Sequence, residues 1–258
     1  MKTKICGIEI TNPDKIVDKK TTKLDVIKYY EKISAYILPH LKNRYVTEVR
    51  CHCGFEDCFF KKHPDKSAEK LLEISSKKDL ILDAQLGAIE FHPYGSFSFS
   101  TNKPNIMIFD LDPDKNVPLS KLRKCTLNLK KILNDLNLNC FLKTSGGKGY
   151  HIVVPFENVK SWASFSKLSK QIAELMVAKY PDLCTTNIKL SERKNKIFID
   201  YLRNKKSATC VAPYSLRARE NLPVSLPISW SDINKISPNQ VNIKNIDKYL
   251  RKDAWKGF

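Results

Sequence analysis

Residues 106–114 read Ile-Met-Ile-Phe-Asp-Leu-Asp-Pro-Asp, and this stretch decides how the rest of the chain is interpreted. Four apolar residues lead into Asp110 and Asp112, and Pro104 and Pro113 bound the run. A short apolar run of this kind predicts a buried strand. Because side chains alternate faces along a strand, the two carboxylates should project from the same side at its end.

Two neighbouring carboxylates repel each other, and burying them unpaired is costly. A divalent cation removes both problems, and hard cations such as Mg²⁺ and Mn²⁺ bind carboxylate oxygen. Paired carboxylates that hold such metals recur in nucleotidyl and phosphoryl transfer. The alternative is a strand that ends in an Asp-Pro turn, because Asp is a common turn former. The stretch alone leaves both interpretations open.

A second apolar strand is predicted over residues 196–201, Lys-Ile-Phe-Ile-Asp-Tyr, and it also ends in a carboxylate, Asp200. A third acid beside Asp110 and Asp112 would complete a cradle for two metal ions.

The charge of the chain indicates a polyanionic partner. Lys and Arg number 45 against 27 Asp and Glu among 258 residues, a net charge of +18 that is spread along the sequence. Nucleic acid is the first candidate and an anionic membrane the second; solubility or a lysine-rich proteome is the plainer explanation. Residues 1–9 are too polar for a signal peptide, and no apolar run approaches the ~20 residues of a membrane span. We therefore expect a cytoplasmic, nucleoid-associated protein without a membrane partner.

Apolar spacing predicts the main elements. Helices are expected over residues 23–40, with Thr22 as N-cap and Pro39 near the end, over 119–138 and over 161–179. Strands are expected over residues 45–51, 141–143 and 152–155. Residues 78–89 are predicted to be extended and then helical, and residues 243–255 to form a short closing helix.

The eight cysteines lie in a chain without a secretion signal, which favours free thiols or a metal site over disulfides. Cys51, Cys53 and Cys58, with His52 or His63, could bind zinc, although their spacing is not a standard finger spacing. Buried or idle thiols are the alternative.

Cations and aromatic rings alternate after the strand at 45–51. Arg50, Lys61 and Lys62 flank Phe59 and Phe60, which combines charge with the stacking faces that unpaired bases need. The alternative is an amphipathic strand with one of the two phenylalanines in the core.

A glycine-rich loop at residues 144–151 separates two predicted strands. It lacks the Walker spacing, yet such a turn can direct backbone N–H groups, Ser145 and Lys148 at phosphate oxygens; a flexible hairpin tip is the alternative.

Arg217 and Arg219 would share a face of an extended segment, which suits fork-like phosphate contacts. His92 precedes the carboxylate strand; a lone histidine is usually structural, but this position favours contact with a metal or nucleotide.

Four stretches in this order resemble the polymerase domain of bacterial and archaeal DNA ligase D, the end-joining polymerases of the archaeo-eukaryotic primase superfamily. They are residues 109–113, 143–151, 199–204 and 212–219. The resemblance runs nearly end to end, from Asn12 to Trp255. It implies one α+β primase-polymerase domain over residues 1–258, with a mixed or antiparallel central sheet flanked by helices and a smaller N-terminal lobe. The absence of a ligase or nuclease portion implies a stand-alone polymerase.

The resemblance also implies roles for individual residues. The catalytic, metal-binding acids would be Asp110, Asp112 and Asp200. Nucleotide contacts are implied for His92, Ser145, Lys148, His151 and Arg217. DNA contacts are implied for Lys15 and Lys23, which would hold a 5′-phosphate, for Arg50, Phe59, Phe60 and Lys62 on the template side, and for Arg193. This sequence departs from the family pattern in two places. Lys15 and Lys23 are two residues closer together, and Arg-Cys-His-Cys-Gly stands where the family has Arg-Cys-Pro-x-Gly.

The function implied is template-directed addition of nucleotides that fills gaps and extends ends in non-homologous end joining. Two Mn²⁺ or Mg²⁺ ions and an NTP or dNTP substrate are implied, with a preference for ribonucleotides. The implied partners are DNA with gaps, breaks or 3′ overhangs carrying a 5′-phosphate, a Ku protein and a separate DNA ligase. The alternatives are a de novo primase, against which Lys15 and Lys23 argue, and a non-catalytic DNA-end-binding module, against which the three acids argue.

Overall fold

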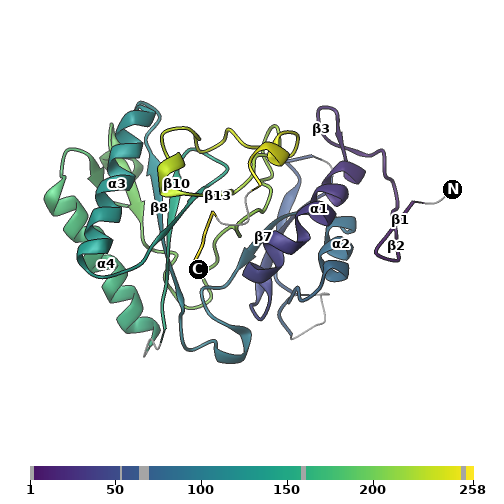
Figure 1. Cartoon of the computed structure of the whole chain (residues 1–258), viewed down its shortest axis with the longest axis horizontal. Helices are drawn as coiled ribbons and strands as arrows, with labels where there is room; N and C mark the ends of the chain where they lie inside the picture. The colour runs from purple at the N-terminus through teal and green to yellow at the C-terminus, as the bar shows by residue number, and fades with distance from the viewer. Residues whose placement is uncertain (1–2, 53, 64–69, 158–160, 251–253) are drawn as a thin grey trace. The chain divides into compact units, whose positions relative to one another are not determined.

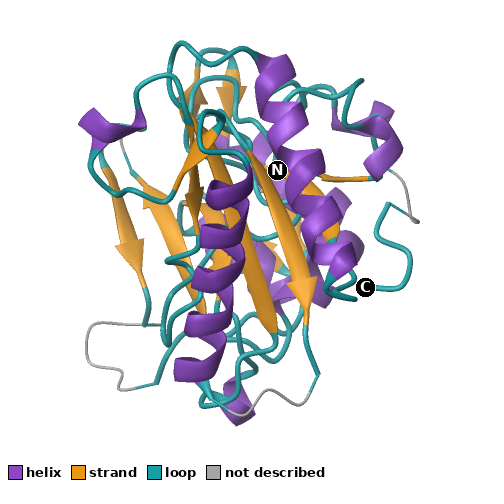
Figure 2. Cartoon of the chain, turned by 90° about the vertical axis from the view of Figure 1, so that its left-hand side faces the viewer, coloured by secondary structure: helices purple, strands orange, loops and turns teal. Residues whose placement is uncertain are grey.

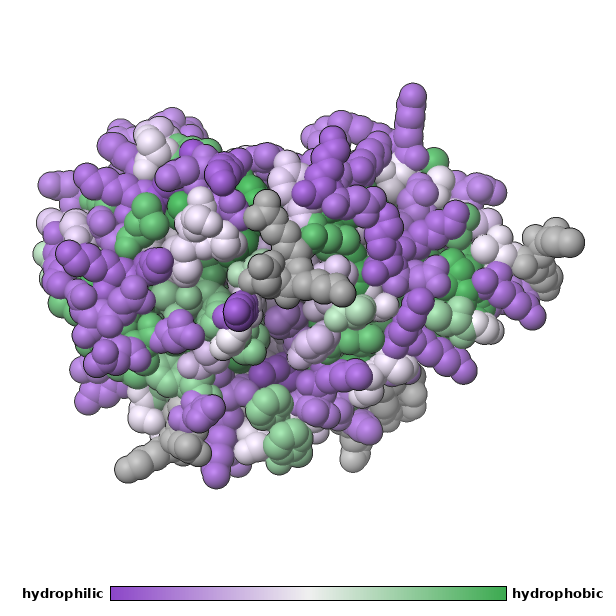
Figure 3. All heavy atoms as spheres, in the orientation of Figure 1, coloured by the Kyte–Doolittle hydropathy of each residue, from purple (hydrophilic) through white to green (hydrophobic). Residues whose placement is uncertain are grey.

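The computed structural model describes residues 3–52, 54–63, 70–157, 161–250 and 254–258. The chain forms two compact units. Unit 1 comprises Met1–Tyr94, Thr209–Ser225 and Val241–Leu250, and unit 2 comprises Gly95–Ala208, Leu226–Gln240 and Arg251–Phe258. Hydrophilic residues cover much of the face seen in Figure 3. Among the described residues, no helix combines the length and the apolar character needed to cross a membrane.

Unit 2 is built on a six-stranded mixed sheet (Figure 1). Its order is β11 (Cys184–Thr185), β12 (Ile197–Asp200), β8 (Ile106–Pro113), β10 (Tyr150–Pro155), β9 (Phe141–Thr144) and β13 (Pro227–Ile228). The β11–β12 pair is parallel and the other pairs are antiparallel. Helices α3 (Leu119–Asp135) and α4 (Trp162–Lys179) pack on this sheet and on each other, and Figure 2 views the sheet with these helices in front.

The central strand β8 shows the predicted alternation. Met107, Phe109 and Leu111 are fully buried, whereas Asp110 and Asp112 project from the opposite face. Burying one apolar face under helices while the other remains polar is the arrangement that a period of two favours. The predicted α+β class with a mixed central sheet is confirmed.

Unit 1 contains the antiparallel sheet β6 (Cys58–Lys61), β5 (Val46–Cys51) and β7 (Ala88–Pro93). Helices α1 (Lys23–Leu41) and α2 (Lys77–Gln85) pack against each other and against β7. Two short hairpins complete it, β1 (Lys4–Ile5) with β2 (Ile8–Glu9) and β3 (Ile16–Asp18) with β4 (Thr21–Thr22). The predicted N-cap of α1 is present, as Thr22 and Asp25 form a reciprocal capping box.

Two predictions of local structure were wrong. Residues 78–89 form a helix before a strand, because Ser76 and Asp79 make a capping box and Gly87, at φ +94°, lets the chain turn into β7. In place of a closing helix over 243–255, the described residues there show only a short 3₁₀ turn, Ile246–Lys248. The Asn242 side chain accepts from Lys244 N–H, and the Asn245 side chain accepts from Asn242 N–H; such local bonds compete with a helix.

The prediction for the cysteines also needs correction. Cys51 and Cys58 form a disulfide, because the pairing of β5 with β6 places them directly opposite each other. Two of the proposed zinc ligands are therefore bonded to each other, and Cys53, the third cysteine of that set, lies outside the described residues. His63 is exposed, with Nδ1 3.3 Å from the Lys70 carbonyl. The described cysteines Cys6, Cys125, Cys140, Cys184 and Cys210 are not in disulfide bonds.

Candidate active site

The predicted acids belong to one row of side chains across the sheet of unit 2. Lys143 on β9 is opposite His151 on β10, His151 is opposite Asp110 on β8, and Asp110 is opposite Asp200 on β12. Directly opposite residues of antiparallel strands project from the same face, with Cβ atoms about 4.5–5.5 Å apart. Asp112, two residues beyond Asp110, shares that face and is exposed.

Asp110 is connected through His151 to Lys143. Lys143 Nζ lies 2.8 Å from His151 Nδ1, and His151 Nε2 lies 3.3 Å from Asp110 Oδ1. A lysine ammonium can only donate, so Nδ1 accepts and Nε2 carries the proton that faces Asp110. Burial opposes ionisation of Asp110, but the electrostatic attraction and hydrogen bond of the His151 Nε2–H group, with the charges of Arg203 and Lys143, hold its pKa at about 2. The carboxylate is therefore ionised at neutral pH.

The pKa of Asp200 is shifted in the opposite direction. Its Oδ1 accepts from Leu202 N–H at 2.8 Å, and its Oδ2 lies 3.4 Å from Arg203 Nε. Burial is the main reason that the pKa of Asp200 is raised, and the negative charge of Asp110 adds to it. The two carboxylates thus repel each other, and a shared cation would relieve that repulsion.

The three predicted acids are suited to a divalent cation by the positions of their backbones on the sheet. Among the residues that the structure describes, no three His, Cys, Asp or Glu side chains converge as a preformed metal site. The strand register nevertheless puts Asp110, Asp112 and Asp200 on one face, where each carboxylate now turns to other partners.

The glycine-rich loop between β9 and β10 is held by Ser145. Its Oγ accepts from the N–H groups of Gly147 and Gly149, at 3.0 and 3.2 Å. Ser145 is buried, whereas Lys148 is exposed at the tip of the loop. Gly149 is required here, because an added Cβ would lie 1.9 Å from the Leu111 carbonyl oxygen. The loop is therefore an ordered turn beside β8 and not a loose hairpin tip.

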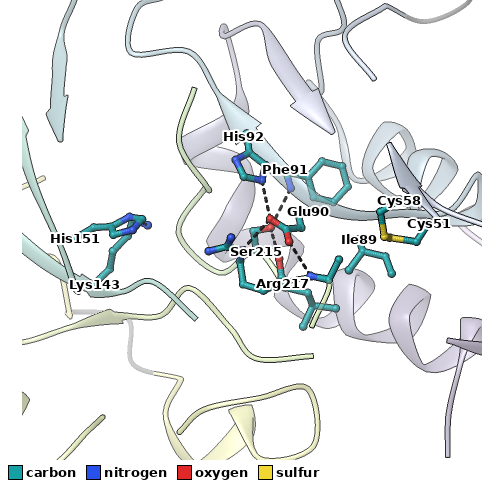
Figure 4. A network of polar contacts seen from close by, with 12 residues as sticks. Cys51, Cys58, Ile89, Glu90, Phe91, His92, Lys143, His151, Ser215 and Arg217 are labelled. Carbon is teal, nitrogen blue, oxygen red and sulfur yellow. Dashed lines mark hydrogen bonds and ion pairs between the residues drawn. A yellow bond between two sulfur atoms is a disulfide. The ribbon is translucent and has the colours of Figure 1, made fainter. Parts of the chain in front are cut away.

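In unit 1, His92 and Arg217 meet at a residue that the sequence did not single out, Glu90. Figure 4 shows both side chains pointing at its carboxylate. His92 Nε2 and Arg217 Nε each lie 2.8 Å from Glu90 Oε2, and Ala218 N–H donates to Oε1 at 2.7 Å. Burial opposes ionisation of Glu90, but these partners hold its pKa at about 2. The anion fixes the orientation of both nucleotide-site candidates.

The predicted template-side group divides into buried and exposed members. Phe59 and Phe60 on β6 are 41% and 72% exposed, and Lys62 is exposed. Arg50 is 7% exposed, and its guanidinium donates to Glu48 at 2.6 Å and to Asp83 at 2.9 Å. In this structure Arg50 is a buried ion-pair partner, and its contact with DNA stays a prediction.

Lys15 and Lys23 line one cavity of unit 1, with a volume of about 290 Å³. Lys23 Nζ donates to the Thr11 carbonyl at 2.8 Å, and its pKa is lowered by burial and by the charge of Lys15. His52 is also in the wall, and its ring lies 5.2 Å from that of Phe59. Two ammonium groups in one hollow form a site suited to a phosphate.

Arg193 lies in unit 2, at the end of the 3₁₀ turn Leu190–Arg193. Its guanidinium stacks on the Phe198 ring at 3.5 Å and donates to the carbonyls of Asn187 and Ile188. The arginine is thus anchored to β12, the strand that carries Asp200.

Comparison with known proteins decides the family. The model of the LigD primase-polymerase domain matches residues 22–255. The chain belongs to the LigD primase-polymerase domain family. The predicted resemblance is confirmed. The first three of the four stretches that carry it contain the acidic row of unit 2, and the fourth supplies Arg217 and Ala218 to Glu90 in unit 1.

Two curated LigD relatives cover nearly all of this chain. The multifunctional non-homologous end joining protein LigD of Pseudomonas aeruginosa is 31% identical over 98% of the chain, and that of Mycolicibacterium smegmatis is 32% identical over 88%. The chain spans about a third of these relatives, 33% and 32% of their length. A solved polymerase domain of Mycobacterium tuberculosis ligase D, in complex with DNA, matches with a TM-score of 0.85 and 27% identity over 94% of this chain and 95% of that one.

Glu90 and Lys143 had weak local signals in the sequence. Glu90 lies two residues before His92, so the two share a face of β7. Lys143 opens the glycine-rich stretch, but its burial at 1% depends on the sheet around it.

Lys143→Met should weaken catalysis and leave the fold intact, because methionine keeps the length of the side chain and removes only its donor. Partners that orient the ligands of a metal site are typically worth about 10- to 100-fold in activity, and Lys143 acts on the predicted ligand Asp110 through His151. We expect a loss of that size in primer extension, with a shift of the His151 imidazole towards the other tautomer in ¹⁵N NMR spectra. Lys167→Met, on the exposed side of α4, is the control and should change neither. An unchanged His151 tautomer in the Lys143 variant would contradict the assigned hydrogen bond.

Proposed function

We propose that this chain is a template-directed nucleotidyltransferase that fills gaps and extends 3′ ends of DNA during non-homologous end joining, with a preference for ribonucleotides. The observation that carries the proposal is the row from Lys143 to Asp200, in which ionisable groups face one side of a sheet in a LigD primase-polymerase domain.

The three acids share one role in the proposed reaction. Asp110, Asp112 and Asp200 would hold two divalent cations, Mn²⁺ or Mg²⁺. When bound, these ions would lower the pKa of the primer 3′-hydroxyl and neutralise the leaving pyrophosphate. His151 keeps Asp110 ionised, so this carboxylate carries the charge that a cation requires. In-line positioning of the hydroxyl against the α-phosphate supplies much of the remaining rate.

The nucleotide contacts follow the two clusters. Ser145, Lys148 and His151 would contact the triphosphate of an incoming NTP or dNTP, together with Arg217. Glu90 accepts from Nε of the Arg217 guanidinium, a group whose planar fork of N–H donors suits phosphate oxygen. His92, held by the same carboxylate, would contact the sugar.

The partners proposed are DNA ends and gaps with a 5′-phosphate, a Ku protein and a separate DNA ligase. Support for DNA comes from the net charge of +18, from the cavity of Lys15 and Lys23, and from a structural neighbour that was solved with DNA. The exposed Phe59 and Phe60 offer stacking faces for template bases.

Primer extension on gapped duplexes tests this function directly. The wild type should extend a primer across a gap faster when the downstream strand carries a 5′-phosphate, and faster with NTPs than with dNTPs, in Mn²⁺ or Mg²⁺. The variant with Lys15→Ala and Lys23→Ala should lose the advantage given by the phosphate, because two ammonium groups in the cavity are removed. The remaining extension should equal that on the unphosphorylated gap.

The matched control replaces Lys121 and Lys124 on α3 by alanine, which removes the same charge from the surface of unit 2. It should retain the response to the 5′-phosphate. If the phosphate changes neither binding nor extension by the wild type, the end-joining assignment fails, and synthesis on unprimed template would then point to a primase.

A further inference from the structure

A second cavity of unit 1, with a volume of about 450 Å³, has a lysine-rich wall that none of the predicted roles uses. It lies between the β3–β4 hairpin, helix α1 and residues 243–244. Its lysines are Lys20, Lys28, Lys32 and Lys244. A hollow lined mostly by one sign of charge focuses the potential and attracts ions of the opposite sign.

The charges of this cavity are only partly balanced. Lys32 pairs with Asp247, with Nζ 2.8 Å from Oδ2, and Asp25 accepts the Thr22 N–H and hydroxyl as part of the helix cap. Lys20, Lys28 and Lys244 are exposed, and none of them forms an ion pair with another residue that the structure describes. Lys20, Lys28 and Lys244 therefore line a common hollow without an ion-pair partner, and the carboxylate in the same wall, Asp25, is engaged in the helix cap.

The wall favours a phosphate without its base. A nucleotide site needs an apolar or aromatic face for the base, but Tyr29, the aromatic residue in the wall, is 3% exposed, and its hydroxyl donates to the Tyr214 carbonyl. Ammonium groups offer several N–H donors each and recognise phosphate as point charges. The ligand chemistry that fits is the sugar-phosphate backbone of a nucleic acid.

The neighbouring cavity indicates which part of the DNA would lie there. Lys20 is in the turn of the β3–β4 hairpin, between Lys15 and Lys23 in the chain, and Lys28 is on the helix that begins at Lys23. The two cavities thus share one short segment, residues 15–28. A 5′-phosphate is the first phosphate of the downstream strand, so the phosphates that follow it belong to the downstream duplex.

We propose that Lys20, Lys28 and Lys244 form a second phosphate-binding site that holds the backbone of the duplex downstream of the 5′-phosphate. The site rests on the proposed function for its position on the DNA, but its phosphate chemistry stands on the cavity itself. Through this site the protein binds downstream duplex independently of the terminal phosphate.

The test compares two triple variants of the full chain that lose equal charge. One carries Lys20→Ala, Lys28→Ala and Lys244→Ala; the control carries Lys121→Ala, Lys124→Ala and Lys131→Ala on the exposed side of α3. Binding to a 5′-phosphorylated gap is measured by fluorescence anisotropy across a salt series. Each phosphate contact that is lost should reduce the slope of log K against log salt by about 0.9. We expect a reduction of up to about 2.7 for the cavity variant, which loses three contacts, and no change of slope for the control.

Downstream length provides the second measurement. Lengthening the downstream duplex from a few base pairs to a full helical turn should tighten binding by the wild type and the control, and leave the cavity variant unchanged. Equal losses in both triple variants, or a length effect that survives in the cavity variant, would overturn the proposed site. Pyrophosphate binding is measured on the same variants, and its loss in the cavity variant with normal DNA binding would overturn the assignment to the nucleic-acid backbone.

The two proposals fail in different ways. If the wild type does not extend primers but the cavity variant still loses its response to duplex length, the polymerase function is wrong and the phosphate site stands. If the wild type extends primers and the cavity variant binds every substrate as the wild type does, the phosphate site is wrong and the polymerase function stands.

Discussion

Asp110→Asn is expected to reduce primer extension by about a thousandfold or more, because a divalent metal contributes several kcal/mol to such a transition state and each ~1.4 kcal/mol is tenfold in rate. Asparagine keeps the size of the side chain and an oxygen that can accept from His151 Nε2, so the strand and its neighbours should remain in place. What is lost is the negative charge that a cation requires. DNA affinity should fall by less than about threefold, since one acid is removed from a surface whose binding is dominated by cations.

Asp114→Asn is the matched control for this substitution. Asp114 follows the same strand, and its Oδ2 accepts from Asn195 N–H at 2.9 Å, an interaction that an amide oxygen can preserve. Extension by this variant should stay within about twofold of the wild type, as for most substitutions away from a functional site. Both variants are compared in single-turnover extension and in anisotropy with the same gapped DNA. Extension that persists in Asp110→Asn would remove Asp110 from the metal site.

The sequence predicted the members of the acidic row better than their arrangement. An apolar run ending in Asp-Leu-Asp predicts that Asp110 and Asp112 share a face, because that follows from the geometry of one strand. The position of Asp200 beside Asp110 depends on the pairing of β12 with β8, strands that lie about ninety residues apart in the chain, and no local pattern specifies it. The resemblance supplied that step, and the register agrees with it.

Buried charges were the weakest point of the sequence analysis. Glu90 and Lys143 resemble ordinary surface residues until the fold surrounds them, and Arg50 was interpreted as a DNA-contacting cation beside Phe59 and Phe60, whereas it is buried. Their partners are on other elements: Arg217 for Glu90, His151 for Lys143 and Asp83 for Arg50. The Cys51–Cys58 disulfide was missed for a related reason. The sequence analysis disfavoured disulfides because the chain shows no secretion signal, and the proximity of the two cysteines depends on the β5–β6 register.

Arg50→Met is expected to lower the free energy of unfolding by about 3–5 kcal/mol, the cost typical of removing one member of a buried ion pair. Arg50 Nε lies 2.6 Å from Glu48 Oε2 and its NH2 group 2.9 Å from Asp83 Oδ1, with the three side chains 8%, 0% and 9% exposed. Methionine fills similar space, so the loss reports the two carboxylates left without a cation. Lys62→Met, on the exposed end of the same sheet, should change the unfolding free energy by less than about 0.5 kcal/mol.

The pH dependence of the unfolding free energy distinguishes loss of these buried charges from a packing defect, which would not change with pH in the same direction. Burial raises the pKa of Glu48, and the negative charge of Asp83 raises it further, while Arg50 opposes the shift; burial likewise raises the pKa of Asp83. Across the range between the ordinary carboxyl pKa and the raised one, the folded state binds more protons than the unfolded state. The stability that Glu48 and Asp83 contribute is therefore greatest at acidic pH and decreases as pH rises. Removing Arg50 raises both pKa values further and widens that range.

Chemical denaturation at about pH 5 and about pH 8 should accordingly show a larger loss of stability with rising pH in Arg50→Met than in the wild type, since the neutral acids tolerate burial and the anions do not. Adding Glu48→Gln to Arg50→Met removes one of the two uncompensated carboxyl groups. The double variant should recover part of the stability at the higher pH and lose most of the excess pH dependence. If Arg50→Met is destabilised equally at both pH values, or if Glu48→Gln makes the loss worse at the higher pH, the buried charges do not account for the stability of this sheet.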